Sequence, residues 1–166
     1  MWFTREADYA LRIVSELAYR KCKMDAKLIA YLTGVTVSFT LKILRKLVKA
    51  GIVRSYKGIS GGYIMDKAPQ EISVRQVVEI IDGPVAINRC IKAGEDCSRV
   101  SDKNCCPIHL ALWKINDRIL EQLDEVHISD IVADYVPGRE PEQAAAVLAL
   151  DQEELLSYPI SPGTNG

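Results

Sequence analysis

Two short amphipathic segments separated by a tight glycine-containing turn constrain the fold of this chain more than any other feature. The first segment opens at Asp25 and ends at Gly34, where a glycine can adopt the left-handed conformation that terminates a helix. The second begins at Thr36 or Ser38, either of which can cap it, and ends at Gly51. Its expected inward positions recur at helical spacing, at Phe39, Ile43, Leu44, Leu47 and Val48. The pattern predicts a helix-turn-helix.

A β-hairpin is predicted directly after these helices. Residues 52–56 and 63–65 are apolar and β-prone, and the link between them is basic and rich in glycine. An amphipathic helix over residues 4–20, with Thr4 as its N-cap, comes first in the chain. A capping box from Ser73 to Gln76 opens a further helix that reaches residue 81. The predicted fold class is mainly α with a small β-hairpin wing, a winged helix-turn-helix.

The charge is distributed unevenly along the chain. Between Ala26 and Met65 there are seven Lys and Arg and no Asp or Glu. Residues 1–67 carry 13 basic against 5 acidic side chains, and residues 68–166 carry 8 against 17, so balances of +8 and −9 leave the net charge of −1. The first part is expected to meet a polyanion, and the alternative is a basic surface that is only solvated.

The second helix of the helix-turn-helix is the expected recognition helix for double-stranded DNA. Its N-terminal residues would face base edges in the major groove, and its later cations would lie nearer to phosphate. The flexible wing would reach the flanking backbone or minor groove. The expected DNA-binding residues are Ser38, Thr40, Lys42, Arg45 and Lys46 on the helix, and Lys57 and Ser60 on the wing. A helix-turn-helix used for protein contacts is the competing hypothesis.

A cluster of soft metal ligands follows the wing. Residues 85–108 show no periodicity, and Cys90, Cys97, Cys105, Cys106 and His109 fall within 20 residues. Zinc sites usually contain two close CxxC or CxxH pairs, and only Cys106 and His109 are that close here. Widely spread thiolates favour an iron–sulfur cluster. Zinc, and a thiol–disulfide switch without metal, remain alternatives.

Two assignments within this loop are open from the residues alone. Cys105 and Cys106 cannot easily both ligate one iron, and we favour Cys106 as the ligand because it opens the following helix near its dipole-positive end. His109 is either a ligand or an ordinary first-turn residue of that helix.

The remainder of the chain is expected to pair two subunits. A long helix over residues 109–126 has a wide apolar stripe, at Leu112, Trp113, Ile119, Leu120 and Leu123, which suits a partner subunit. Ser129 can cap a short helix through Val132, and an isolated helix is predicted over 141–156 in an acidic tail. We therefore divide the chain into a winged-helix domain (1–83), a cysteine loop (84–108), a dimerisation region (109–136) and a flexible tail (137–166).

The chain resembles the IscR/NsrR group of winged-helix regulators from bacteria. The motifs that carry the resemblance are FTREADYA at 3–10, GISGGY at 58–63, the cysteine loop, and ISDIV at 128–132. The likeness covers residues 1 to about 135. It implies a homodimer, paired through the long helix, which binds a palindromic operator. It also implies an iron–sulfur cluster on three loop cysteines that changes the affinity for DNA.

The fourth cluster ligand differs between branches of that group. In IscR-like members it is a histidine after the third cysteine, which corresponds to His109 and would suit a 2Fe-2S cluster. In NsrR-like members it is an aspartate from the first helix of the other subunit, which corresponds to Asp8 and would suit a 4Fe-4S cluster. This chain has both residues.

Enzymatic activity and membrane insertion are not expected. No Ser/His/Asp set, phosphate loop or pair of carboxylates stands in a pocket pattern, and there are only two histidines. No apolar run approaches the ~20 residues of a membrane helix, and the first residues lack the pattern of a signal peptide. A cytoplasmic protein is the expectation.

Overall fold

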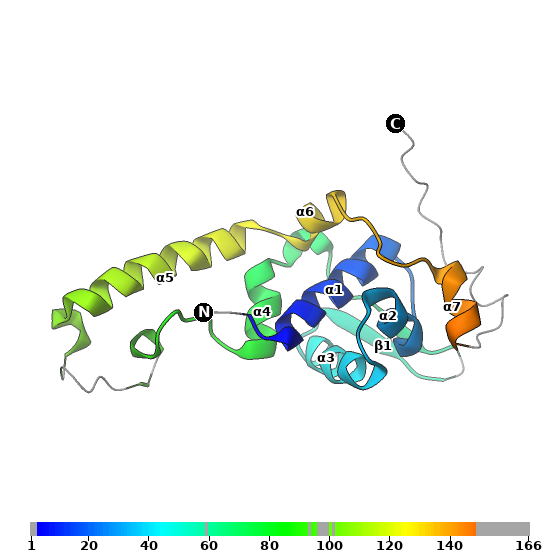
Figure 1. Cartoon of the computed structure of the whole chain (residues 1–166), viewed down its shortest axis with the longest axis horizontal. Helices are drawn as coiled ribbons and strands as arrows, with labels where there is room; N and C mark the ends of the chain where they lie inside the picture. Colours follow the sequence, from blue (N-terminus) through cyan, green and yellow to red (C-terminus); the bar gives the residue numbers. More distant parts are fainter. Residues whose placement is uncertain (1–2, 59, 93, 96–99, 101, 149–166) are drawn as a thin grey trace.

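The computed structural model describes residues 3–58, 60–92, 94–95, 100 and 102–148. The chain is mainly helical with one two-stranded hairpin, as predicted, and its longest helix projects from a body built by the N-terminal half (Figure 1). The elements that form this body and its wing are α1 (Arg5–Arg20), α2 (Ala26–Thr33), α3 (Val37–Lys49), β1 (Val53–Tyr56), β2 (Gly62–Met65) and α4 (Val74–Asp82). Those that follow are α5 (Pro107–Glu125), α6 (Ile128–Ala133) and α7 (Pro141–Leu148).

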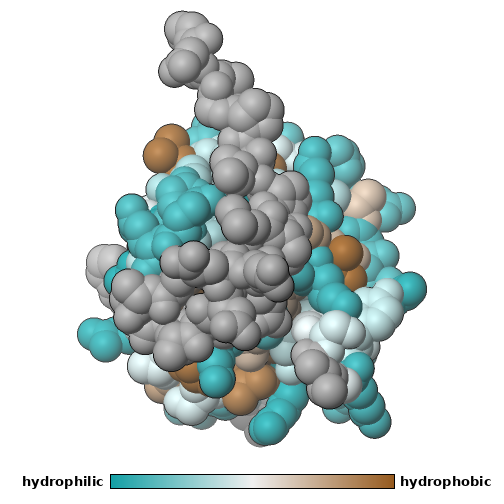
Figure 2. Space-filling model, turned by 90° about the vertical axis from the view of Figure 1, so that its right-hand side faces the viewer, coloured by the Kyte–Doolittle hydropathy of each residue, from teal (hydrophilic) through white to brown (hydrophobic). Residues whose placement is uncertain are grey.

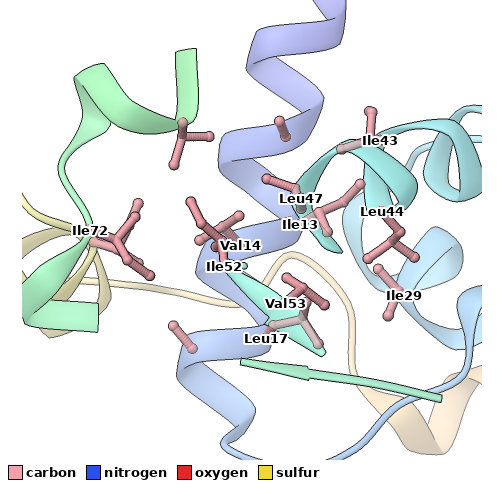
Figure 3. Packing of buried hydrophobic residues seen from close by; sticks show 14 of the residues in the cluster. Ile13, Val14, Leu17, Ile29, Ile43, Leu44, Leu47, Ile52, Val53 and Ile72 are labelled. Carbon is pink, nitrogen blue, oxygen red and sulfur yellow. The ribbon is translucent and has the colours of Figure 1, made fainter. Parts of the chain in front are cut away.

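Helix α1 is the centre of the hydrophobic core. The side chain of Thr4 accepts a hydrogen bond from the backbone N–H of Ala7 (3.2 Å), which confirms the predicted N-cap. One face of the helix then meets α2, α3 and α4, and the close view shows Ile13, Val14 and Leu17 pointing into the packed cluster (Figure 3). Each such side chain contributes about 1.5–3 kcal/mol on burial. Helix α3, the expected recognition helix, is therefore packed firmly against α1.

The helix-turn-helix follows from the predicted caps. The carboxylate of Asp25 accepts hydrogen bonds from the backbone N–H groups of Lys27 (2.7 Å) and Leu28 (3.0 Å), and so starts α2. Gly34 ends it with φ of 69°, in the left-handed region. Thr36 is the N-cap residue of α3 in an extended conformation, so of the two predicted starting points Thr36 is the one observed.

The wing is an antiparallel hairpin in which Val53 pairs with Met65 and Tyr56 with Gly62. Its tip needs glycine, because a Cβ on Gly61 would lie 2.7 Å from the carbonyl oxygen of Tyr56. Met24 extends the hairpin on the other side by exchanging two backbone hydrogen bonds with Tyr63, at 3.0 and 2.8 Å. The wing is thereby fastened to the segment between α1 and α2.

Helices α4 and α6 close the body. The predicted capping box of Ser73 and Gln76 is present at the start of α4. Our prediction that Ser129 caps α6 is wrong, because α6 begins at Ile128 with His127 as the N-cap residue. His127 forms an isolated β-bridge with Ser73, and the backbone N–H of Ile128 donates to the carbonyl of Ile72 (2.9 Å), so the helix begins two residues earlier than the sequence suggests.

The two C-terminal helices differ from their predicted forms. Helix α5 starts at Pro107, since a proline suits the first helical position. Helix α7, described over Pro141–Leu148, is not isolated: it packs against α2, with Ala144 fully buried, so residues 141–148 are part of the packed body. The predicted continuation to residue 156 lies outside the described residues.

In the part of the chain that the structure describes, no single helix is both long and apolar enough to cross a membrane. Helices α2 and α3 would reach that length only together, and they meet at 109°.

Candidate DNA-binding surface and cysteine loop

Helix α3 exposes a polar and basic face along its length. Ser38, Lys42 and Arg45 are exposed, as predicted, and Lys49 is exposed as well. Val37 and Phe39 are exposed as well, so the start of the helix combines apolar and polar groups on one side. Such a mixture can contact both the thymine methyl group and hydrogen-bonding base edges.

Two residues of α3 lie on the opposite side from the predicted one. Thr40, predicted to contact DNA, is 0% exposed and cannot reach a duplex. Phe39, predicted to point inward, is 45% exposed and packs edge-on against Tyr9, with ring centroids 6.1 Å apart. The buried stripe is Thr40, Ile43, Leu44 and Leu47, which is the i, i+3, i+4, i+7 spacing of one helix face.

The lysines of α3 are paired with an acid from α1. Glu6 forms ion pairs with Lys42 (Nζ to Oε2, 2.8 Å) and Lys46 (Nζ to Oε1, 2.7 Å). Partial burial alone would raise the pKa of Glu6, but the two ammonium groups outweigh it and the pKa is lowered. Lys46 also donates to the carbonyl oxygen of Ile81 (3.0 Å) and so ties α3 to α4. Sequence reasoning missed Glu6, whose partners lie 36 and more positions away.

The wing presents Lys57 and Ser60, both exposed, on either side of its tip. Residue 59, between them, lies outside the described residues. Lys23 reaches the wing from the α1–α2 link, with its ammonium 5.5 Å from the ring centroid of exposed Tyr56. The cations of the wing and of α3 thus lie on two separate elements. In a winged helix that binds DNA, this allows the helix to contact the major groove while the wing contacts the DNA backbone.

The loop cysteines occupy different environments. Cys90 is half-buried in a short 3-10 turn (Arg89–Ile91), Cys105 is exposed in another (Lys103–Cys105), and Cys106 is buried as the N-cap residue of α5. Cys97 lies outside the described residues. The thiol of Cys105 donates to the carboxylate of Asp102 (3.5 Å), and this hydrogen bond and the negative charge raise the pKa of Cys105. A raised pKa opposes formation of the thiolate that a metal needs.

The two candidates for a fourth ligand are arranged differently. His109 is half-buried in the first turn of α5, and its Nδ1 atom is buried without a hydrogen-bond partner among the described residues. Asp8 is exposed on α1 and paired with Arg12 (Oδ2 to Nη2, 2.7 Å). Among the described residues, no three His, Cys, Asp or Glu side chains are grouped closely enough to hold a metal ion.

Helix α5 is largely exposed among the described residues, with its packing limited to α4, the two short 3-10 turns of the loop, and Leu120 and Leu123, which are partly buried against the core. Asn116 is its one buried residue, and its side-chain oxygen accepts from the backbone N–H of Ile87 (3.0 Å), which fixes the start of the cysteine loop on the helix. Trp113, predicted to lie in the apolar stripe, is exposed. Other large apolar side chains of this region are also exposed, namely Ile108, Leu110, Ile115 and Val126. An exposed apolar surface of this kind is typical of a protein interface.

The first turn of α1 connects the end of α4, where the loop begins, to α3. Thr4 donates through its hydroxyl to Asp82 (2.6 Å) and through its backbone N–H to the same carboxylate (3.2 Å). Asp82 ends α4 immediately before the loop begins, and Glu6 on the same turn of α1 holds the lysines of α3. A shift of the loop could therefore reach α3 through two sets of polar contacts, those of Asp82 with Thr4 and those of Glu6 with the lysines.

Comparisons with known proteins agree with this arrangement. The family described as "Rrf2: Iron-dependent Transcriptional regulator" matches residues 3–134. An HTH-type transcriptional regulator called rrf2-like, from Rhodobacter capsulatus, is 32% identical over 137 residues, which are 78% of this chain and 91% of the relative. The HTH-type transcriptional regulator IscR of Pectobacterium carotovorum is 28% identical over 135 residues, covering 80% of this chain and 79% of the relative.

The fold has solved counterparts. The structure of CymR, the global cysteine regulator of Bacillus subtilis, superposes with a TM-score of 0.67 at 23% identity, covering 82% of this chain and 99% of that chain. At this identity the likeness shows the fold alone, and it confirms the predicted winged helix.

Proposed function

The chain belongs to the Rrf2 family of transcriptional regulators, and on that premise we propose that it is a homodimer that binds a palindromic DNA operator under the control of an iron–sulfur cluster. The observation that carries the cluster is the start of α5. Cys106 is buried there as the N-cap residue, and His109, in the same turn, has a buried Nδ1 atom with no hydrogen-bond partner among the described residues. Leaving a buried polar atom unsatisfied costs about 1–3 kcal/mol, and a metal ion would remove that cost.

The proposed ligands are Cys90, Cys97, Cys106 and His109. Cys106 is preferred over Cys105 because the neighbouring Asp102 raises the pKa of Cys105, whereas Cys106 faces the positive end of the α5 dipole. When bound, an iron–sulfur cluster supplies a redox-active, oxidant-labile group. The chain's own residues would supply three thiolates, one imidazole, and the hydrogen bond from Ile87 to Asn116 that holds the loop on α5.

Asp8 is the alternative fourth ligand, donated by the partner subunit. It would first have to give up its ion pair with Arg12, which lies one helical turn away. His109 has no such competing partner at Nδ1 among the described residues, and we therefore favour it.

The proposed DNA contacts are Ser38, Lys42 and Arg45 on α3, and Lys57 and Ser60 on the wing. Thr40 is excluded by its burial, and Lys46 because its ammonium lies between Glu6 and the carbonyl of Ile81. Dimerisation through α5 would cover its exposed apolar side chains and would fix the distance between two recognition helices.

The test begins with purification in the absence of oxygen. We expect brown protein with matched iron and sulfide and an absorption band that Cys106→Ala and His109→Ala reduce. Asp8→Ala is the matched control, expected to leave the absorption intact. Loss of the cluster in Asp8→Ala, with retention in His109→Ala, would move the fourth ligand to the partner subunit. Operator affinity is then compared with and without the cluster by fluorescence anisotropy.

A zinc- or thiol-switch regulator without a cluster is the second candidate. The exposure of the Cys105 thiol directly beside Cys106 favours it, because an exposed thiol is open to oxidation. Colourless protein that contains zinc, or whose DNA affinity changes with cysteine oxidation after complete iron removal, would support this second candidate and refute the cluster.

A further inference from the structure

The segment that follows α6 is built into the body by buried polar contacts. Arg20, 1% exposed at its side chain, pairs with Glu16 within α1 (2.8 Å) and with Glu140 from the distant segment (3.0 Å). The hydroxyl of Tyr135 donates to the other oxygen of Glu16 (2.6 Å). A buried charge without its partner costs several kcal/mol, so these contacts define the position of residues 135–140 closely.

This segment places Arg139 beside the turn between α2 and α3. Its Nη1 donates to the carbonyl oxygen of Tyr31 (2.8 Å), and its guanidinium carbon lies 5.2 Å from the centroid of the Tyr31 ring. A Cβ placed on Gly34 would lie 4.0 Å from Nη2. The side chain is exposed, and Figure 2 views the molecule from the side that carries α7, where much of the coloured surface is hydrophilic.

The hollow beside Arg139 contains two cations. It is shallow, lies between α2 and the start of α3, and its lining includes Arg139, Lys27, Tyr31 and Thr36. No Asp or Glu lines it, and the neighbouring carboxylate of Glu140 is turned toward Arg20. In a helix-turn-helix the first helix crosses the DNA backbone while the start of the second enters the groove, so this hollow faces the duplex.

We propose that Arg139, together with Lys27, binds a phosphate group of the DNA backbone beside the recognition helix. The inference rests on the proposed DNA-binding function. Tyr31 occupies one of the five N–H donors of the guanidinium and holds its plane, which leaves donors for a phosphate oxygen. Arg139 lies beyond the family match, which ends at residue 134.

The test measures affinity across a range of salt concentrations, using a short fluorescent duplex that the protein has selected from a random-sequence pool. Each phosphate contact contributes about 0.9 to the slope of log affinity against log salt. When salt is raised from 50 to 200 mM, the affinity of both proteins for DNA should fall. For each bound protomer, the fall should be about 3.5-fold larger for wild type than for Arg139→Gln. Arg139→Lys should keep most of the slope, and Lys27→Gln should lower it by a similar amount.

The control is Arg118→Gln, an equal charge change at an exposed position of α5. An unchanged slope in Arg139→Gln, with thermal unfolding equal to wild type, would overturn the proposal and assign Arg139 to bracing α2 only. A reduced slope in Lys27→Gln alone would also overturn it. Absence of salt-dependent binding by the wild-type protein would instead refute the DNA-binding function itself.

Discussion

Replacing Glu6 by glutamine is expected to strengthen DNA binding while it weakens the fold. The carboxylate of Glu6 holds the ammonium groups of Lys42 and Lys46 at 2.8 and 2.7 Å. A duplex that uses Lys42 must first take it from Glu6. Glutamine keeps the size of the side chain and removes the charge, so the lysine is released without a change in packing.

The magnitude follows from the exposure of the pairs. Lys42 is 56% and Glu6 18% exposed at the side chain, so the pair resembles a surface salt bridge, which contributes about 0.2–1 kcal/mol. Release of Lys42 then improves DNA binding by about 0.5 kcal/mol, a gain in affinity of about twofold. Because Glu6→Gln loses both ion pairs, its free energy of unfolding should be lower than that of wild type by about 0.5–1 kcal/mol.

The assay compares anisotropy titrations of wild type, Glu6→Gln and Glu71→Gln on one duplex at fixed salt. Glu71→Gln carries the same change in net charge on the 3-10 turn (Pro69–Glu71) that packs on α6, away from α3. It therefore reports the general effect of one added positive charge. An affinity of Glu6→Gln equal to that of Glu71→Gln, or lower than wild type, would refute the reasoning that Glu6 competes with DNA.

Three further outcomes are expected. Cys106→Ser should lose the cluster absorption and the bound iron, whereas Cys105→Ser should keep both. Loss in Cys105→Ser with retention in Cys106→Ser would make Cys105 the ligand instead of Cys106. Trp113→Glu should convert the dimer to a monomer in light scattering, because the exposed ring lies on the proposed interface; an unchanged mass would place the interface elsewhere. Burial and the hydrogen bond to Glu16 raise the pKa of Tyr135 above the ordinary value of 10. The folded protein therefore holds the phenol proton more tightly than the unfolded chain, and the free energy of unfolding of the wild type should fall as the pH rises above 10. In Tyr135→Phe this fall should be smaller. Parallel denaturant midpoints for the two proteins from pH 9 to 11 would contradict that linkage.

Local signals in the sequence predicted the winged helix well. Thr4, Asp25 and Ser73 cap their helices as expected, because each cap needs only a side chain and the N–H groups two or three residues on. The wing follows from glycines that the backbone geometry requires. These features depend on a few neighbouring residues and can therefore be predicted without knowledge of the fold.

Features that depend on distant contacts were not predictable in this way. The inward face of α3 was predicted correctly at Ile43, Leu44 and Leu47 and wrongly at Phe39. Phe39 and Thr40 both fit a helical stripe, and only the position of α1 decides between them. The docking of α7 depends on Arg20 and Glu140, which are 120 positions apart. The apolar side chains of α5 could be read as core or interface, and the structure divides them: Trp113 is exposed, whereas Leu120 and Leu123 are partly buried against the core.

The position of α1 explains how one loop could control two DNA contacts without a separate hinge. Beyond Ala7 the helix is locked by apolar packing against α2, α3 and α4, which resists small displacements. Its first turn is different, because Thr4 and Glu6 are held there by polar contacts to Asp82 and to the lysines of α3. Such contacts exchange partners at a cost of about 1 kcal/mol, far less than repacking a core side chain. A change in the loop that follows Asp82 is therefore expected to act through the first turn of α1 and to alter how many lysines α3 offers to DNA.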